Sequence, residues 1–120
     1  MKPKSSKAKG RRLQNYVRDK LRLAFIDRWT KIPKLQEDDI KSQTMGMPGE
    51  DIILSPRARQ YIPYSFECKN VEKLQFWATV EQAESNIKEE TTPAIVIKKN
   101  RKKPHVAIPL DHFIELIRGE

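Results

Sequence analysis

The sequence contains few of the features that mark secreted or membrane proteins. Its 120 residues include one cysteine, so no internal disulfide can form and a reducing compartment is expected. The longest purely aliphatic run covers only residues 94–97, which is too short to cross a bilayer. The N-terminus is basic, but no apolar stretch follows it, so no secretory signal is predicted. We therefore expect a cytoplasmic protein without a membrane segment.

Acidic residues are outnumbered by basic ones, 16 against 24, which gives a net charge of +8. A charge of this sign favours a polyanionic partner such as nucleic acid. Eleven of the positive charges lie in two runs, residues 1–12 and 98–103, and without those eleven the net +8 becomes −3 for the remainder. A slightly acidic centre between basic flanks suits a metal-dependent enzyme acting on nucleic acid, because lysines hold phosphates and carboxylates hold a cation. A solvated tail and a solvated hairpin tip are the alternative interpretation.

The spacing of apolar residues predicts a single mixed α/β domain. Residues 1–9 show no apolar periodicity and are predicted to form a flexible basic arm, which leaves residues 10–120 as the domain. The segment 55–62, which contains a proline, is predicted to be a loop. The predicted helices cover residues 10–29, 71–89 and 111–117, and the predicted strands cover residues 40–45, 51–54, 64–69, 94–98 and 105–108. This order of elements belongs to the mixed α/β class.

The strand predicted at residues 64–69 carries a carboxylate and an ammonium group two positions apart. Because side chains alternate along a strand, Glu67 and Lys69 point to one face and Cys68 points to the other. The 15 residues between Asp51 and Glu67 are enough for one strand to end and the chain to return alongside it. We therefore expect Asp51 to lie beside Glu67.

Two converging carboxylates repel each other unless a cation lies between them, and Mg²⁺ or Mn²⁺ is the natural occupant. The backbone carbonyl of Cys68 is a candidate third oxygen ligand. Such an ion would polarise a phosphodiester and lower the pKa of a water molecule, while Lys69 would hold that water or neutralise the developing charge. The plainer interpretation is that Glu67 and Lys69 form an exposed pair on a solvated face.

These residues resemble a known family. Gly49-Glu50-Asp51 followed by Glu67-Cys68-Lys69, on the order α-β-β-β-α-β, is similar to the PD-(D/E)xK nuclease superfamily. Within it, the chain most resembles small archaeal-type and phage Holliday junction resolvases. Lys9-Gly10 ahead of the first helix and Lys41-Ser42 before the aspartate add to the similarity, which extends over about residues 9–117.

The resemblance implies a restriction-endonuclease-like core, in which helices flank a central mixed sheet. It implies that Asp51 and Glu67 are metal ligands, with Cys68 contributing its carbonyl as suggested above. It also implies that Lys69 is catalytic and that Gln14 and Ser42 have supporting catalytic roles.

Two positions depart from the pattern of the superfamily. Glu50 stands where many members have proline before the aspartate, a change that the superfamily tolerates. Gln14 stands where many junction resolvases have a glutamate, and because an amide is not an anionic ligand, the resemblance leaves open whether one or two metal ions bind. Gln82 corresponds to a glutamine on the helix of several relatives, although an exposed helix amide is an equally good interpretation.

Several basic residues are expected to contact DNA phosphates without reading sequence. Arg57 and Arg59 lie in the predicted loop between the two carboxylate-bearing strands, where the loop would overhang the cation, with plain solvation as the alternative. The complete set of expected phosphate contacts is Lys9, Arg11, Arg12, Arg57, Arg59, Lys98, Lys99, Arg101, Lys102 and Lys103.

The function predicted from these features is that of an Mg²⁺-dependent endonuclease that resolves four-way DNA junctions. Symmetric cleavage of a two-fold junction needs two active sites, so a C₂ homodimer is expected. The expected location is the cytoplasm of a bacterial or archaeal cell, with a viral gene as one source. The alternatives are a related nuclease that cuts flaps, mismatches or duplex DNA, and a DNA-binding protein without catalytic activity.

Overall fold

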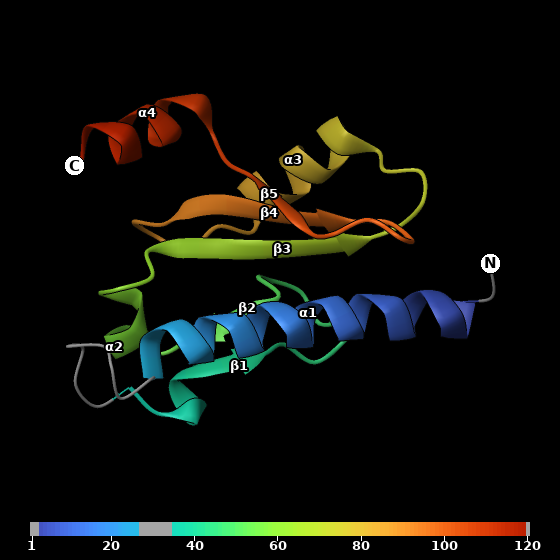
Figure 1. Cartoon of the computed structure of the whole chain (residues 1–120), viewed down its shortest axis with the longest axis horizontal. Helices are drawn as coiled ribbons and strands as arrows, with labels where there is room; N and C mark the ends of the chain where they lie inside the picture. Colours follow the sequence, from blue (N-terminus) through green and yellow to red (C-terminus); the bar gives the residue numbers. More distant parts are fainter. Residues whose placement is uncertain (1–2, 27–34, 120) are drawn as a thin grey trace.

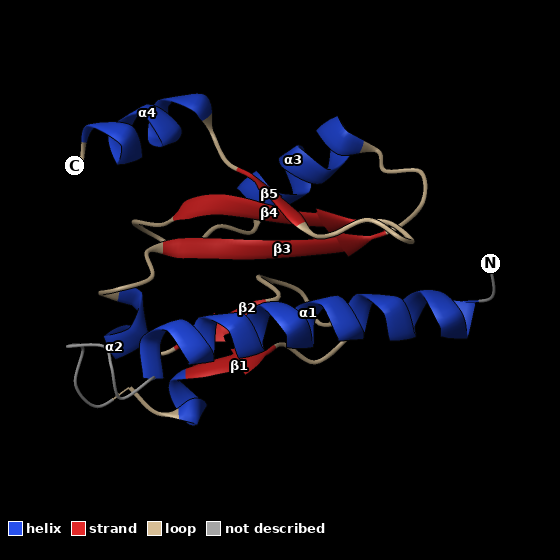
Figure 2. Cartoon of the chain, in the orientation of Figure 1, coloured by secondary structure: helices blue, strands red, loops and turns tan. Residues whose placement is uncertain are grey.

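The structure is a computed structural model that describes residues 3–26 and 35–119. Figure 1 shows a central sheet with two helices on one side, and with the long first helix and a small hairpin on the other. The elements are α1 (Pro3–Ile26), a 3₁₀ turn (Glu37–Asp39), β1 (Ile40–Ser42), β2 (Ile52–Leu54), α2 (Pro56–Arg59), β3 (Tyr64–Asn70), α3 (Phe76–Ser85), β4 (Thr92–Lys98), β5 (His105–Ala107) and α4 (Leu110–Arg118). The mixed α/β class predicted from the sequence is confirmed (Figure 2).

The first helix begins earlier than predicted. α1 starts at Pro3 instead of Gly10, so most of the segment expected to be a flexible arm is helical. Proline is well tolerated in a first helical turn, because its missing N–H has no partner there in any case. Leu13 and Val17, one turn apart, are buried and fix the face that α1 turns toward the core. The predicted end at Trp29 lies outside the described residues.

The hairpin of β1 and β2 packs beneath α1 and supplies the centre of the core. The two strands are antiparallel, with Ile40 opposite Leu54 and Ser42 opposite Ile52. Ile40 and Ile52 are fully buried, and they belong to the same apolar cluster as Leu13. The turn between the strands contains Gly46 at a φ of 85°, a left-handed conformation that favours glycine.

The central sheet has the order β3-β4-β5, with β3 and β4 parallel and β5 antiparallel to β4. It is therefore the mixed sheet that the sequence predicted. A parallel pair needs a long crossover, and α3 provides it. α3 covers residues 76–85 and not the predicted 71–89, and its Thr79 and Ala83 are buried.

The segment predicted as a loop at residues 55–62 contains the short helix α2. Ser55 caps it, since its Oγ accepts a hydrogen bond from the Ala58 N–H at 3.1 Å, and Pro56 occupies the first turn. The C-terminal helix α4 is joined to β3 by a contact between Tyr64 Oη and His112 Nε2, which lie 2.5 Å apart. Within the described ranges, no helix is both long enough and apolar enough to cross a membrane.

Candidate active site

Asp51 lies at the edge of β3 because two hydrogen bonds, one from its backbone and one to its side chain, join it to that strand. Its backbone N–H donates to the carbonyl oxygen of Phe66 at 2.8 Å. Its carboxylate Oδ2 accepts a hydrogen bond from the backbone N–H of Cys68 at 2.7 Å. These two bonds place Asp51 next to Glu67, as the length of the connecting segment led us to expect.

Glu67 is buried in the middle of β3, with 4% of its surface exposed. The alternative interpretation of Glu67 and Lys69 as an exposed pair on a solvated face is therefore wrong for the glutamate. Lys69 is half-buried on the same face, two residues along the strand. Cys68 points to the other face, and burial raises the pKa of its thiol, which suits an inert core cysteine.

The carboxylates of Asp51 and Glu67 face a surface hollow where four parts of the chain meet. α1, the turn between β1 and β2, β3 and α3 all contribute to it. The residues around it are Gly10, Gln14, Met45, Gly46, Met47, Pro48, Asp51, Glu67, Cys68, Lys69 and Gln82. Gly10 lets α1 approach the turn closely, because a Cβ at this position would lie 3.2 Å from Cε of Met45.

The two carboxylates are more easily protonated than ordinary acids. Burial raises the pKa of Glu67 to about 7, and the nearby charge of Asp51 adds to the effect while Lys69 opposes it. Burial also raises the pKa of Asp51, against the hydrogen bond from Cys68, the charge of Lys69 and a hydrogen bond from Gln14. Like charges held together away from water are typical of a functional site, because folding alone gains nothing from them.

The chemistry of the donor atoms fits a hard divalent cation. Gln14 is 5% exposed, and its buried Oε1 has no hydrogen-bond partner within the described residues. The carbonyl of Cys68 lies on the same edge of β3 as its N–H, which faces Asp51. Two carboxylates, an amide oxygen and a backbone carbonyl form an oxygen set of the kind that Mg²⁺ and Mn²⁺ prefer.

Only two of the four candidate oxygen ligands around the hollow are carboxylates. Among the residues that the structure describes, no cluster of three or more His, Cys, Asp or Glu side chains is placed to hold a metal. A cation in this hollow would therefore depend on Gln14 and the Cys68 carbonyl as well as on Asp51 and Glu67. The sequence predicted only a supporting role for Gln14. Nothing in the sequence indicates that its side-chain oxygen lacks a hydrogen-bond partner among the described residues.

Three polar residues in or near the hollow differ in how well the sequence predicted them. Ser42 is not among the residues around it; its Oγ donates to Oδ1 of Asn15 at 2.9 Å, on α1 beside Gln14. Gln82 does border the hollow, from α3. Asn86, one turn after Gln82, was missed, and its side chain donates a hydrogen bond that lowers the pKa of Glu67.

Glu50 and Arg59 form a second buried charged group, which the sequence did not predict. Glu50 is 4% exposed and makes an ion pair with Arg59. Burial raises the pKa of Glu50, and the charge of Arg59 opposes that shift. Arg57 and Arg59 belong to α2, which lies beside the start of β3 (Figure 1). Neither arginine borders the hollow. The predicted phosphate contact by Arg59 thus competes with Glu50, and both arginine contacts stay predictions.

The two basic runs of the sequence meet on the surface. Lys9 and Arg12 of α1 lie in one groove with Lys98, Lys102 and Lys103, which flank the turn between β4 and β5. Arg11, Lys99 and Arg101 are exposed outside that groove. The solvated-tail interpretation is wrong for Lys9, which is 6% exposed.

The fold and the hollow define a class of protein. A mixed sheet that carries Glu67-Cys68-Lys69 on its edge strand β3, with Asp51 bonded alongside that strand, has the arrangement of a PD-(D/E)xK nuclease. Residues 5–120 match the family described as "Phage putative PDDEXK endonuclease", and the chain belongs to this family. Searches of curated proteins and of solved structures gave no match.

Proposed function

We propose that this chain is a divalent-metal-dependent endodeoxyribonuclease that resolves four-way DNA junctions in the cytoplasm of a phage-infected cell. The observation that carries the nuclease activity is the pairing of Asp51 with the buried Glu67, with Lys69 on the same face. Nuclease activity follows from the family as well. The choice of a junction as substrate rests on the resemblance to resolvases and on the symmetry argument below.

In this proposal each residue of the hollow has a separate task. Asp51 and Glu67 would hold Mg²⁺ or Mn²⁺, together with Oε1 of Gln14 and the carbonyl of Cys68. The bound cation supplies polarisation of the phosphodiester and a lower pKa for water. The Lys69 ammonium orients the attacking water or stabilises the negative charge that develops on the phosphate oxygens.

Ser42 acts as a positioning residue in the same proposal. Its hydroxyl is bonded to Asn15 and not to a group in the hollow. Asn15 and Gln14 are consecutive on α1, so this bond between β1 and α1 adds to the packing of Leu13 and Val17 in setting the helix rotation that directs Gln14 toward Asp51. Gln82 borders the hollow from α3, where its amide can contact the scissile strand.

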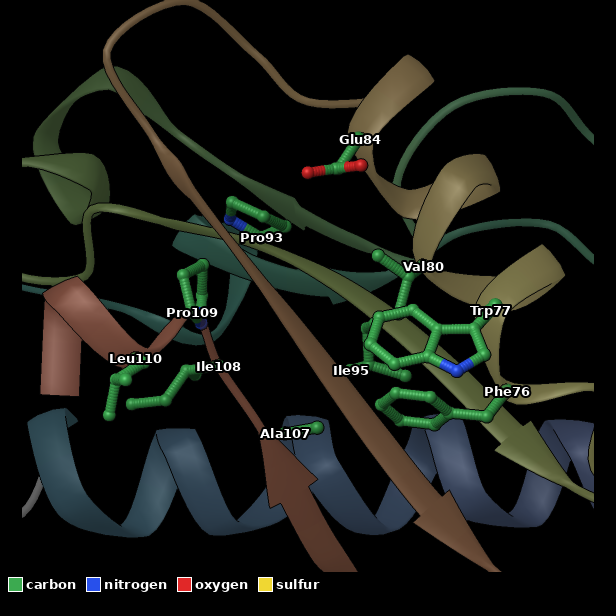
Figure 3. Close-up of a pocket in the computed structure, with 10 residues that line it drawn as sticks. All are labelled: Phe76, Trp77, Val80, Glu84, Pro93, Ile95, Ala107, Ile108, Pro109 and Leu110. Atoms are coloured by element: carbon green, nitrogen blue, oxygen red, sulfur yellow. The ribbon is translucent and has the colours of Figure 1, made fainter.

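A second copy of the chain is the partner that we propose for the apolar surface of α3 and α4. Figure 3 shows a pocket in this surface, whose lining is apolar except for Glu84 and comes from α3, β4, β5 and the segment that leads into α4. Trp77 is 75% exposed and Leu110 is 71% exposed beside it. Monomers rarely expose such contiguous apolar area, and the acidic Asp111 and Glu115 of α4 disfavour DNA on this side.

The symmetry of the substrate supports the same arrangement. A four-way junction has two strands to cut, and a C₂ dimer presents two identical sites to them. Leu110→Glu should convert the dimer to a monomer in sedimentation equilibrium without loss of fold, because the side chain is exposed. A wild-type chain that is monomeric at micromolar concentration would contradict the dimer.

The test of the function is cleavage of a labelled four-way junction with Mg²⁺, beside a linear duplex made of the same strands. We expect paired nicks near the crossover, and we expect Glu67→Gln to abolish them. Glu81→Gln is the matched control, because Glu81 is exposed on α3 and does not border the hollow. Equal cutting of both substrates would leave a general nuclease. Junction binding without any cutting would leave a DNA-binding protein and overturn the enzymatic proposal.

A further inference from the structure

A basic groove lies on the other side of α1 from the carboxylate hollow. We define the basic groove by Lys9 and Arg12 of α1, Asn70 and Lys98 at the ends of β3 and β4, and Lys102 and Lys103 of the following turn. These residues come from three separate parts of the sequence. They concentrate five positive charges around one depression, and such a concentration attracts an anion.

Lys9 is the unusual member of the basic groove. Its side chain is 7% exposed, yet its Nζ has no hydrogen-bond partner within the described part of the chain. A buried ammonium without hydrogen bonds is costly, so the residue needs a compensating anion. Asn70 holds this turn of α1 against β3, because its Nδ2 donates to the carbonyl oxygen of Lys9 at 3.2 Å.

The anion nearest to Lys9 is the carboxylate of Glu72, which borders an adjacent depression that shares Lys98, Lys102 and Lys103 with the basic groove. Its Oε2 lies 3.6 Å from Nζ of Lys9, which is an ion pair longer than a hydrogen bond. The same Oε2 accepts a short hydrogen bond from the backbone N–H of Asn100 at 2.6 Å. An ammonium and a turn N–H converging on one oxygen are the contacts that a phosphate oxygen takes in a binding site.

Glu72 is open to solvent, so an incoming phosphate can reach the same donors and replace it. Its side chain is 44% exposed, and the residue lies in the irregular segment between β3 and α3. A DNA phosphate brings more charge density and more acceptor oxygens than one carboxylate, and the surrounding lysines and Arg12 are positioned to meet them.

We propose that the basic groove binds a backbone phosphate of the DNA, and that Glu72 occupies the phosphate position in the free protein. The inference rests on the proposed function only in taking DNA as the ligand. The Glu72 carboxylate then competes with a DNA phosphate for the same position. It lowers the affinity for DNA, and the phosphate has to displace it in order to bind.

The position of the groove connects it to cleavage. Lys9 faces the groove and the next residue, Gly10, faces the carboxylate hollow; likewise Asn70 faces the groove and Lys69 faces the hollow. The two depressions thus share one dividing ridge, made of α1 and the end of β3. A DNA strand that crosses this ridge can bind Lys9 through one phosphate and place another phosphate of the same strand beside Lys69.

The test measures junction binding in EDTA, where no cutting occurs, over a range of salt concentrations. Glu72→Gln is compared with Glu81→Gln, because both remove one negative charge and only the first removes the charge that faces Lys9. We expect Glu72→Gln to tighten binding several-fold beyond Glu81→Gln. Lys9→Gln is compared with Lys41→Gln, whose lysine is exposed on β1. We expect Lys9→Gln to weaken binding more and to reduce the salt slope by about 0.9, the value of one phosphate contact.

The outcomes separate this proposal from the nuclease proposal. Equal affinities of Glu72→Gln and Glu81→Gln would overturn the role of Glu72, and this comparison stands even if Lys9→Gln does not fold. Inorganic phosphate that protects the chain against unfolding but does not compete with the junction would also contradict the proposal, since the site would then serve free phosphate. Tighter binding by Glu72→Gln in a chain that never cuts DNA would keep the groove and remove the nuclease.

Discussion

Glu50 and Asp51 are consecutive acids, both withdrawn from water, and they point into two different regions of the molecule. Glu50 meets Arg59 of α2, so its charge is neutralised inside the protein. Asp51 meets Glu67, a carboxylate of the same sign, and its own charge is supported first by the hydrogen bond from the Cys68 N–H and then by the charge of Lys69. A neutralised buried charge can be explained by stability alone, whereas a pair of like charges needs a further ligand to explain it. The contrast supports the proposed role of Asp51 in the site and a structural role for Glu50.

The sharpest way to test this contrast is to neutralise each acid in turn. Asp51→Asn keeps an oxygen acceptor for the Cys68 N–H but loses a ligand charge, so cleavage should fall at least about a hundredfold, corresponding to a few kcal/mol. Glu50→Gln should leave the cleavage rate of the folded protein within a few-fold. The measurement is single-turnover cleavage of the junction. Similar losses in both variants would show that the two acids do not have separate roles.

Loss of the ion pair between Glu50 and Arg59 should lower the stability of the protein and not its cleavage rate. Arg59→Ala leaves Glu50 buried without its partner, and we expect the free energy of unfolding to fall by about 3 kcal/mol. Arg11→Ala, at an exposed position on α1, should change it by less than about 0.5 kcal/mol. Urea denaturation followed by circular dichroism measures both. A small effect of Arg59→Ala would mean that Glu50 folds in its neutral form.

The carboxylates of Asp51 and Glu67 should make the metal-free protein less stable as the pH rises. The pKa of Glu67 is about 7 in the folded chain against 4.5 for an ordinary glutamate, so its contribution to stability is complete below pH 4.5 and is lost as the pH passes 7. The loss is roughly 2 kcal/mol once solvent screening is allowed for. Thermal melts in EDTA between pH 5 and 8 measure it, and Glu67→Gln should flatten the profile. Added Mg²⁺ should restore stability at pH 8, and no effect of Mg²⁺ there would argue against cation binding by this pair.

The smallest expected effect belongs to Ser42, which acts at a distance from the carboxylates. Ser42→Ala removes one hydrogen bond to Asn15, so stability should fall by about 1 kcal/mol. Cleavage should slow only a few-fold, because Gln14 keeps its place through the packing of α1. Ser42→Thr, which retains the hydroxyl, should restore both values. A loss of cleavage as large as that of Asp51→Asn would place Ser42 in direct contact with the reacting groups.

The parts of this protein that the sequence predicted are those set by local pattern. The alternation along β3 and the length of the segment from Asp51 were enough to bring the two carboxylates together, and the apolar runs located the strands. The ends of α1 and α3 were predicted poorly. Polar residues before Gly10 and after Ser85 carry no apolar periodicity that could show whether a helix continues through them.

The partners of charged residues were not predictable in the same way. The pair of Glu50 and Arg59 depends on α2, which the sequence presented as a proline-containing loop. The burial of Lys9 depends on the helical start at Pro3 and on the approach of Glu72 from beyond β3. Such contacts are set by how elements dock, and a single sequence carries no direct record of docking.

The location of Asp51 also bears on when a nascent chain becomes able to cut DNA. Asp51 precedes β2 of the small hairpin, while Glu67 and Lys69 belong to the central sheet, and the backbone bond from Asp51 to Phe66 lies between them. Neither sheet alone carries both carboxylates. A partly folded chain, in which only one sheet has formed, therefore lacks the assembled carboxylate pair, so under the proposed function hydrolytic competence is coupled to completion of the tertiary structure.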